Sequence, residues 1–200
     1  MGVKARRVGA ARRSRGRRGR RPGLIPFLLM SAVFILAATA VGKDRVQKPP
    51  AAYVEEIAPL CEKLGEELPL VLAVIQAESR FRENIRSPKG AVGLMQVMPD
   101  TAGWMAEQLG LEDYADEKLY EREWNLIIGI SYLRYLQQLF PDNLAQTLAA
   151  YNAGPNRVKS WTSAGDWDGS AGKLEDIPYA ETRNYVKKVL KIYDNYRRIY

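Results

Sequence analysis

Proline and glycine residues divide residues 53–200 into segments with helical character. Pro69 and Pro99 stand at first-turn positions, where proline fits a helix, and Gly65 and Gly110 follow helical runs, where glycine commonly ends one. No strongly alternating pattern typical of strands is present. Helices are predicted at residues 53–65, 68–81, 99–110, 125–140 (capped by Asn125), 142–154, 155–161 and 178–200. The sequence therefore predicts a mainly α domain.

The N-terminal part has a different composition from this domain. Residues 1–23 contain ten Lys or Arg and no acid, and the eighteen residues 24–41 carry no charge. Such a run can just cross a bilayer, with the basic flank in the cytoplasm, so we expect a transmembrane anchor at 24–41. The small residues 38–40 also fit the cleavage site of a signal peptide, which would leave a secreted protein. A nucleic-acid role for the arginines is disfavoured because they adjoin this apolar run.

Residues 42–52 end the extension and contain paired prolines, which predicts a short stiff linker. One domain at 53–200 would then lie on the outer side of the cytoplasmic membrane. The 200-residue chain contains no histidine, and Cys61 is its single cysteine. These facts exclude an internal disulfide, a catalytic triad that needs histidine, and the His/Cys clusters that bind zinc.

One glutamate continues an apolar stripe. If residues 71–81 are helical, Val71, Val74, Ile75 and Glu78 share one face. Glu78 is then either a surface residue paired with Arg82 at i, i+4, or a desolvated acid whose pKa is raised so that it can donate a proton. The helical pattern alone leaves both interpretations open.

Two polar segments, 82–98 and 162–176, do not fit the helical pattern. In the first, Ser87, Gly90 and Gly93 form turns and permit close backbone approach to another group, although a plain connecting loop would look the same. Further on, Tyr151 and Asn152 precede a helix end and could hydrogen-bond a sugar or its N-acetyl group. A buried tyrosine with a satisfied hydroxyl is an equally good interpretation.

Five short motifs occur in an order that resembles a known family. They are ESRF at 78–81, S..GA.GLMQ.MP.TA at 87–102, N...G..YL at 125–133, AYNAGP at 150–155 and YAETRNYV at 179–186. Together they cover most of residues 53–200 and resemble the soluble lytic transglycosylase (SLT) family of peptidoglycan-cleaving enzymes. The resemblance implies a lysozyme-like, goose-type helical fold, glycan strands of peptidoglycan as substrate, and no metal or cofactor.

The resemblance also implies a mechanism. Glu78 corresponds to the family's single catalytic acid and base, which cleaves the bond between N-acetylmuramic acid and N-acetylglucosamine and leaves a 1,6-anhydromuramic end. A goose-type muramidase, which adds water instead, is an alternative with the same fold. A non-catalytic peptidoglycan-binding protein of the envelope is another, and loss of Glu78 would be its expected mark.

Further site residues follow from matched motif positions. The resemblance implies that the groove is lined by Ser87, Met95 and Gln96, and that substrate is contacted by Tyr151, Asn152 and Glu181. Tyr151 would hydrogen-bond Glu78 or the acetamido group. Glu181 has a structural alternative, because an acid in the first helical turn after Pro178 is favoured by the helix dipole. Trp104, Trp161 and Trp167 could stack on sugars, although burial of tryptophan is more common.

Overall fold

The computed structural model describes residues 46–200, so the predicted anchor at 24–41 and its basic flank lie outside the described residues. Within 46–200 no helix has the length and apolar character needed to cross a membrane. The elements are α1 (Ala51–Leu64), α2 (Leu68–Glu78), α3 (Pro99–Leu109), η2 (Asp116–Tyr120), α4 (Arg122–Leu139), α5 (Leu144–Ala153), α6 (Pro155–Ala164), η3 (Ala171–Asp176) and α7 (Ala180–Tyr196). The prediction of a mainly helical domain is confirmed.

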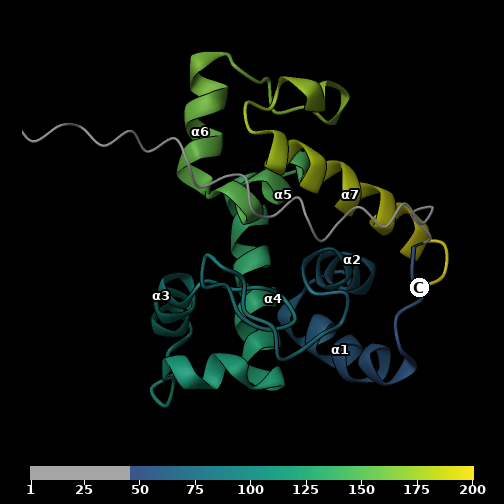
Figure 1. Cartoon of the computed structure of the whole chain (residues 1–200), viewed down its shortest axis with the longest axis vertical. Helices are drawn as coiled ribbons and strands as arrows, with labels where there is room; N and C mark the ends of the chain where they lie inside the picture. Colours follow the sequence, from purple (N-terminus) through teal and green to yellow (C-terminus); the bar gives the residue numbers. More distant parts are fainter. Residues whose placement is uncertain (1–45) are drawn as a thin grey trace, which may run out of the picture. The chain divides into compact units, whose positions relative to one another are not determined.

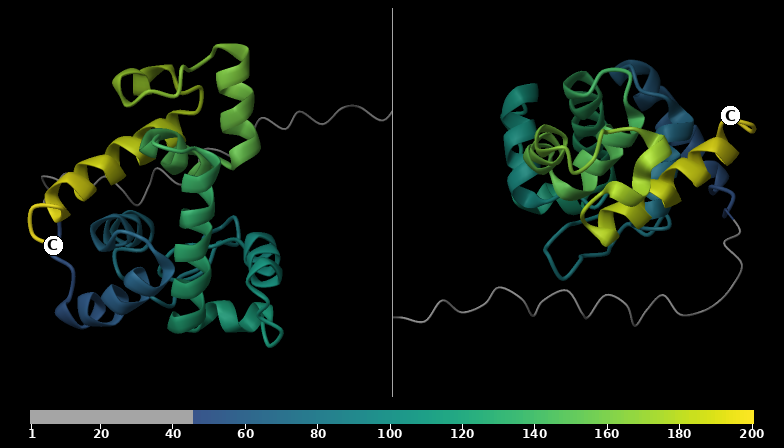
Figure 2. Two further views of the ribbon diagram at one scale, coloured as in Figure 1. Left: turned by 180° about the vertical axis from the view of Figure 1, so that it is seen from behind. Right: turned by 90° about the horizontal axis from the view of Figure 1, so that it is seen from above.

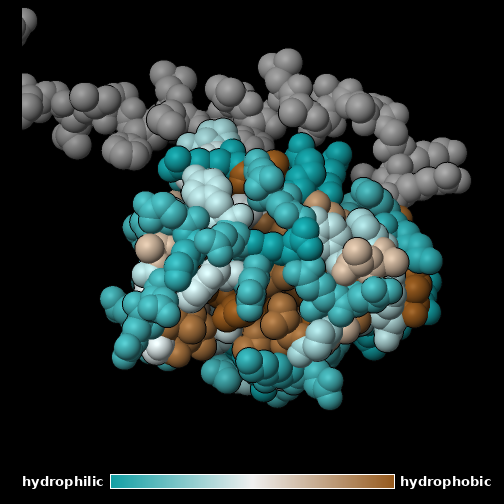
Figure 3. Space-filling model, turned by 90° about the horizontal axis from the view of Figure 1, so that it is seen from below, coloured by the Kyte–Doolittle hydropathy of each residue, from teal (hydrophilic) through white to brown (hydrophobic). Residues whose placement is uncertain are grey.

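Helix α4 runs through the middle of this domain (Figure 1). It contacts α1, α3, η2 and α5, and its core-facing residues at helical spacing are fully buried: Leu126, Ile130, Leu133 and Leu136. Helix α7 packs along α2 and α5, which the turned views of Figure 2 also show. Burial of these apolar faces is the main favourable contribution to folding. On the face drawn in Figure 3, apolar side chains gather near the middle among hydrophilic ones.

Most helix ends occur where proline and glycine predict them. Helix α3 begins at Pro99, and α1 and α3 end at Gly65 and Gly110, both in the left-handed conformation. The predicted helix 68–81 is too long, because the chain leaves α2 after Glu78 and both Arg80 (φ 54°) and Phe81 (φ 61°) are left-handed. The last helix likewise ends at residue 196, short of the predicted position 200.

The prediction that Asn125 caps a helix is wrong. Helix α4 begins three residues earlier, and Asn125 is buried within its first turns. Its side-chain oxygen accepts a hydrogen bond from the amide of Met95 (2.9 Å), while its side-chain nitrogen donates to the carbonyls of Val92 (2.9 Å) and Leu119 (3.1 Å). This asparagine therefore fastens the loop 82–98 to α4, and that loop forms part of the site described next.

Candidate active site

Glu78 is the last residue of α2, on the helix whose apolar face enters the core. The side chain is half-buried, so it keeps some access to solvent while protein atoms surround its carboxyl group. Desolvation by burial raises the pKa of Glu78 to about 7. Arg82, the alternative partner, lies beyond the helix and donates to the carbonyl of Ser79 at 3.0 Å. The geometry thus favours the desolvated acid over the surface pair.

Two side chains of α7 moderate the pKa of Glu78. The Tyr185 hydroxyl is buried, and within residues 46–200 no acceptor or donor meets it at ordinary hydrogen-bond geometry. It lies close enough to the Glu78 carboxyl, however, to lower the pKa of Glu78. The charge of Lys188 lowers this pKa further, and its ammonium donates to the carbonyl of Ala77 at 2.6 Å. Burial and the nearby Glu78 carboxyl raise the pKa of Tyr185 well above its usual range, so this hydroxyl stays neutral.

Tyr151 is the second tyrosine close to Glu78. Burial, and then the Glu78 carboxyl, raise the pKa of Tyr151 well above its usual range. Its hydroxyl donates to the main-chain carbonyl of Met95 at 2.8 Å, a different partner from the predicted Glu78 or acetamido group. The Met95 side chain itself is fully buried against Gly129 of α4, so this residue offers only its backbone to the site.

The loop 82–98 is held in shape by its own hydrogen bonds. Ser87 closes a turn, because its hydroxyl accepts from the amide of Ala91 at 3.0 Å. Gln96 is left-handed (φ 47°), and its amide donates to the carbonyls of Gly93 (2.8 Å) and Ile85 (3.3 Å). The turn and this strained residue fix the loop opposite α5, and Ser87 and Gln96 both stay partly accessible.

A cleft of about 240 Å³ lies between this loop, α3, α4 and the end of α5. Its lining consists of Gln96, Val97, Met98, Thr101, Tyr132, Tyr151, Asn152, Ala153 and Gly154. Glu78 is not in this lining, but Tyr151 both lines the cleft and interacts electrostatically with Glu78. Asn152 is fixed by the buried Thr182 of α7, whose hydroxyl donates to its side-chain oxygen at 2.7 Å.

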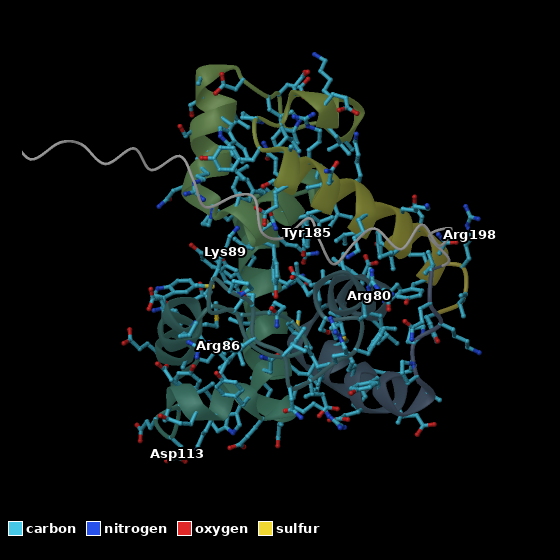
Figure 4. All side chains as sticks on the ribbon, in the orientation of Figure 1. Arg80, Arg86, Lys89, Asp113, Tyr185 and Arg198 are labelled. Atoms are coloured by element: carbon cyan, nitrogen blue, oxygen red, sulfur yellow. The ribbon has the colours of Figure 1, made fainter. Side chains whose placement is uncertain are left out.

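Glu181 lies at the entrance to α7 and is exposed. It forms an ion pair with Lys89 of the loop at 3.1 Å, and its charge contributes to the raised pKa of Glu78. Figure 4 shows Tyr185 on α7 and Lys89 on the loop. Trp161 and Trp167 are buried in the core, whereas Trp104 remains 37% exposed.

Tyr185 is the residue that sequence reasoning missed. It lies in the motif YAETRNYV, four residues after Glu181, but the resemblance implies a site role only for the acid. The i, i+4 spacing from Glu181 could have indicated a second side chain on the same face of α7.

Known proteins have sequences similar to that of this chain. The sequence model of the transglycosylase SLT domain matches residues 59–171. The soluble lytic murein transglycosylase of Escherichia coli K12 is 43% identical over 141 residues, which are 68% of this chain and 22% of that protein. A membrane-bound lytic murein transglycosylase C from Edwardsiella ictaluri is 29% identical over 78% of this chain and 49% of its own length.

Solved structures show the same fold. The crystal structure of the 70 kDa soluble lytic transglycosylase of E. coli has a TM-score of 0.67 and 36% identity, covering 75% of this chain and 25% of that one. The structure of the 70 kDa soluble lytic transglycosylase in complex with bulgecin A has a TM-score of 0.66 and 37% identity, covering 75% of this chain and 24% of that one. The chain thus spans about a quarter of these larger proteins. Since the domain match includes more than half of its residues, the chain belongs to the transglycosylase SLT domain family.

Proposed function

We propose that this protein is a lytic transglycosylase that cleaves the β-1,4 bond between N-acetylmuramic acid and N-acetylglucosamine in peptidoglycan. The observation that carries the proposal is the Glu78 carboxyl, whose pKa of about 7 lets it hold and release a proton at neutral pH. A general acid works best with a pKa near the working pH. The relatives named as murein transglycosylases support the choice of substrate.

Glu78 acts twice in the proposed reaction. It first donates its proton to the glycosidic oxygen while the bond from C1 of N-acetylmuramic acid to that oxygen breaks. The oxygen of the muramic C6 hydroxyl then bonds to C1, and the Glu78 carboxylate accepts the proton that this hydroxyl loses. Glu78 ends protonated, no water is consumed, and the product carries a 1,6-anhydromuramic end.

The surroundings of Glu78 favour this route over hydrolysis by a retaining mechanism. A retaining hydrolase needs a second carboxylate about 5 to 5.5 Å from the first, as a nucleophile. Glu181 is an acid that acts on Glu78 electrostatically, but it is exposed and paired with Lys89. We infer that the acetamido group of the substrate stabilises the developing charge at C1. Gln96, Tyr151 and Asn152 would bind the sugars in the cleft, Ser87 and Met95 would shape it through the loop, and Glu181 would act at its edge.

Digestion of purified peptidoglycan by the full chain in H₂¹⁸O separates the proposed reaction from its alternatives. We expect fragments with anhydromuramic ends, lighter than reducing ends by one water and free of ¹⁸O, by mass spectrometry. An increase in reducing ends over the undigested peptidoglycan, without anhydromuramic ends, would establish a muramidase instead. Binding without any new ends would favour the non-catalytic envelope protein.

We also propose that residues 24–41 anchor the protein in the cytoplasmic membrane of a bacterium, with the catalytic domain outside. The basic flank and the uncharged run support this, as does the relative named as membrane-bound. The molecular mass of the protein, measured after fractionation of the cells, tests this. The full-length mass in the membrane fraction indicates an intact anchor, whereas a mass reduced by the N-terminal residues indicates a cleaved signal peptide.

The pH profile offers a test of the proton donor. Activity requires protonated Glu78, so kcat/KM should fall as the pH rises above about 7. Tyr185→Phe removes a hydroxyl that stabilises the carboxylate, so this falling limb should move up by about one pH unit. Tyr193→Phe, on the same helix but bonded to Glu67, is the matched control and should leave the limb in place. An unchanged limb in Tyr185→Phe would contradict the assigned electrostatics.

A further inference from the structure

A row of aromatic rings leads from the cleft to the surface of α3. Tyr151 contacts Tyr132 (ring centroids 5.6 Å apart), Tyr132 is stacked with Tyr135 (6.3 Å), and Tyr135 meets Trp104 edge to face (4.8 Å). The first two of these rings line the cleft, and the last belongs to a residue 37% exposed. The aromatic row (Tyr151, Tyr132, Tyr135 and Trp104) therefore joins the interior of the site to an open surface.

Helical spacing places Trp104 on the continuation of the cleft. Thr101 lines the cleft from α3, and Trp104 follows it at i+3. On α4, Tyr132 lines the cleft and Tyr135 follows it at i+3. Trp104 and Tyr135 contact each other, so the helical turns of α3 and α4 that follow the cleft-lining turns also lie side by side.

Core packing does not account for the exposed face of Trp104. Trp161 and Trp167 are 7% and 1% exposed, and the ring of Trp124 is half-buried and covered by the Lys118 ammonium at 4.5 Å. Trp104 is therefore the most exposed of the four tryptophans. Met98, which lines the cleft at the start of α3, is also 39% exposed.

We infer that Trp104 forms an additional sugar-binding position, where a ring of the glycan strand beyond those held in the cleft stacks on its indole. The inference rests on the proposed function and extends it. The C–H faces of a pyranose ring are apolar and match an aromatic surface, while the hydroxyls at the ring edge keep contact with water. Only a strand long enough to reach from the cleft to Trp104 would make this contact, so the affinity of the protein for glycan would depend on strand length. Long glycan strands would then be favoured over short fragments.

Binding of peptide-free glycan strands tests the inference without turnover. In the full-length Glu78→Gln background, dissociation constants are measured by calorimetry for a disaccharide and for strands of eight or more sugars. Trp104→Ala should weaken binding of the long strands about tenfold and leave the disaccharide unchanged. Trp104→Phe keeps an aromatic face and should recover part of the loss. In the protein with Glu78 intact, Trp104→Ala should raise KM for long strands with little change in kcat.

Leu109→Ala is the matched control, because Leu109 is an apolar residue with a similar exposed fraction, 39%, at the C-terminal end of α3. It should bind both ligands like the parent. If the Glu78→Gln protein binds long strands equally tightly with and without Trp104→Ala, Trp104 does not form a sugar-binding position, and the proposed function still stands. Equal losses for the disaccharide and the long strands would also overturn the sugar-binding position, since they would mark a general disturbance of the cleft. A parent that binds neither ligand would contradict the proposed function itself.

Discussion

Glu78→Gln is expected to abolish the formation of anhydromuramic ends while leaving the fold intact. Glutamine keeps the shape and the partial burial of glutamate, but its amide cannot donate a proton to the glycosidic oxygen or accept one from the C6 hydroxyl. A general acid or base typically contributes 10² to 10⁴ in rate, and here one group performs both tasks. We therefore expect a loss of at least about 10³ in kcat, measured as anhydro ends released from peptidoglycan.

The same substitution has a second, thermodynamic readout that is independent of activity. Glu78 has a pKa of about 7 in the folded protein, against an ordinary value of 4.5. A pKa raised by folding contributes stability that is fully present below pH 4.5 and is lost as the pH rises through 7. Above pH 7 the parent must bury a charge that glutamine does not carry. Glu78→Gln should thus be more stable than the parent at pH 8, by up to about 3 kcal/mol, and gain less at pH 4.

An exposed glutamate of α1 supplies the control for both readouts. Glu62→Gln should keep full activity and leave the free energy of unfolding close to that of the parent, because Glu62 is exposed on the helix surface. If Glu78→Gln released anhydro ends at the parent's rate, Glu78 would not be the catalytic acid. If its stability followed the parent at both pH values, the carboxyl would not be desolvated in solution.

The helices could largely be predicted from local sequence, since proline and glycine act on the residues beside them. Gly65 and Gly110 end their helices as expected, because a left-handed residue is easily formed by glycine. The end of α2 could not be predicted in this way. There the left-handed residues are Arg80 and Phe81, which are held by contacts such as the Tyr53 hydroxyl donating to the Phe81 carbonyl at 3.3 Å. That contact joins residues 28 positions apart, beyond the reach of a local pattern.

The site shows the same division between local and distant information. The apolar stripe of α2 indicated that Glu78 could be a desolvated acid, because desolvation follows from the face of one helix. Tyr185, which moderates its pKa, comes from α7, and its approach depends on how α7 packs along α2. Asparagine favours helix caps, which is why Asn125 is predicted to be one, yet two of its hydrogen bonds reach Met95 and Val92, 30 and 33 positions away in sequence. Met95 matched a groove motif, but its side chain fills the space beside Gly129.

Gly93→Ala is expected to destabilise the domain, and to do so more than Gly90→Ala, the same substitution at the other glycine of the loop 82–98. Gly93 is left-handed (φ 79°), and a Cβ there would lie 2.3 Å from the side-chain nitrogen of Asn125. Asn125 cannot move away without breaking its bonds to the loop, and buried groups left unsatisfied cost about 1 to 3 kcal/mol each. Together with the backbone strain, the expected loss in the free energy of unfolding is about 3 to 5 kcal/mol, measured by urea titration of the full chain.

Two other glycines separate the contributions to this loss. Gly90 is also left-handed (φ 97°), but the atom nearest to its Cβ would be in the flexible Arg86 side chain at 3.9 Å, so Gly90→Ala should cost only the backbone strain of about 1 to 2 kcal/mol. Gly103 lies inside α3 with open space around its Cβ, so Gly103→Ala should stabilise the protein by up to about 1 kcal/mol. Equal losses in Gly93→Ala and Gly90→Ala would mean that the Asn125 contact does not fasten the loop. A larger loss of stability in Gly93→Ala, together with reduced cleavage, would show that the geometry of the cleft depends on Asn125. The loop that Asn125 holds supplies Gln96 to the cleft, and its Met95 carbonyl accepts the hydrogen bond from the Tyr151 hydroxyl.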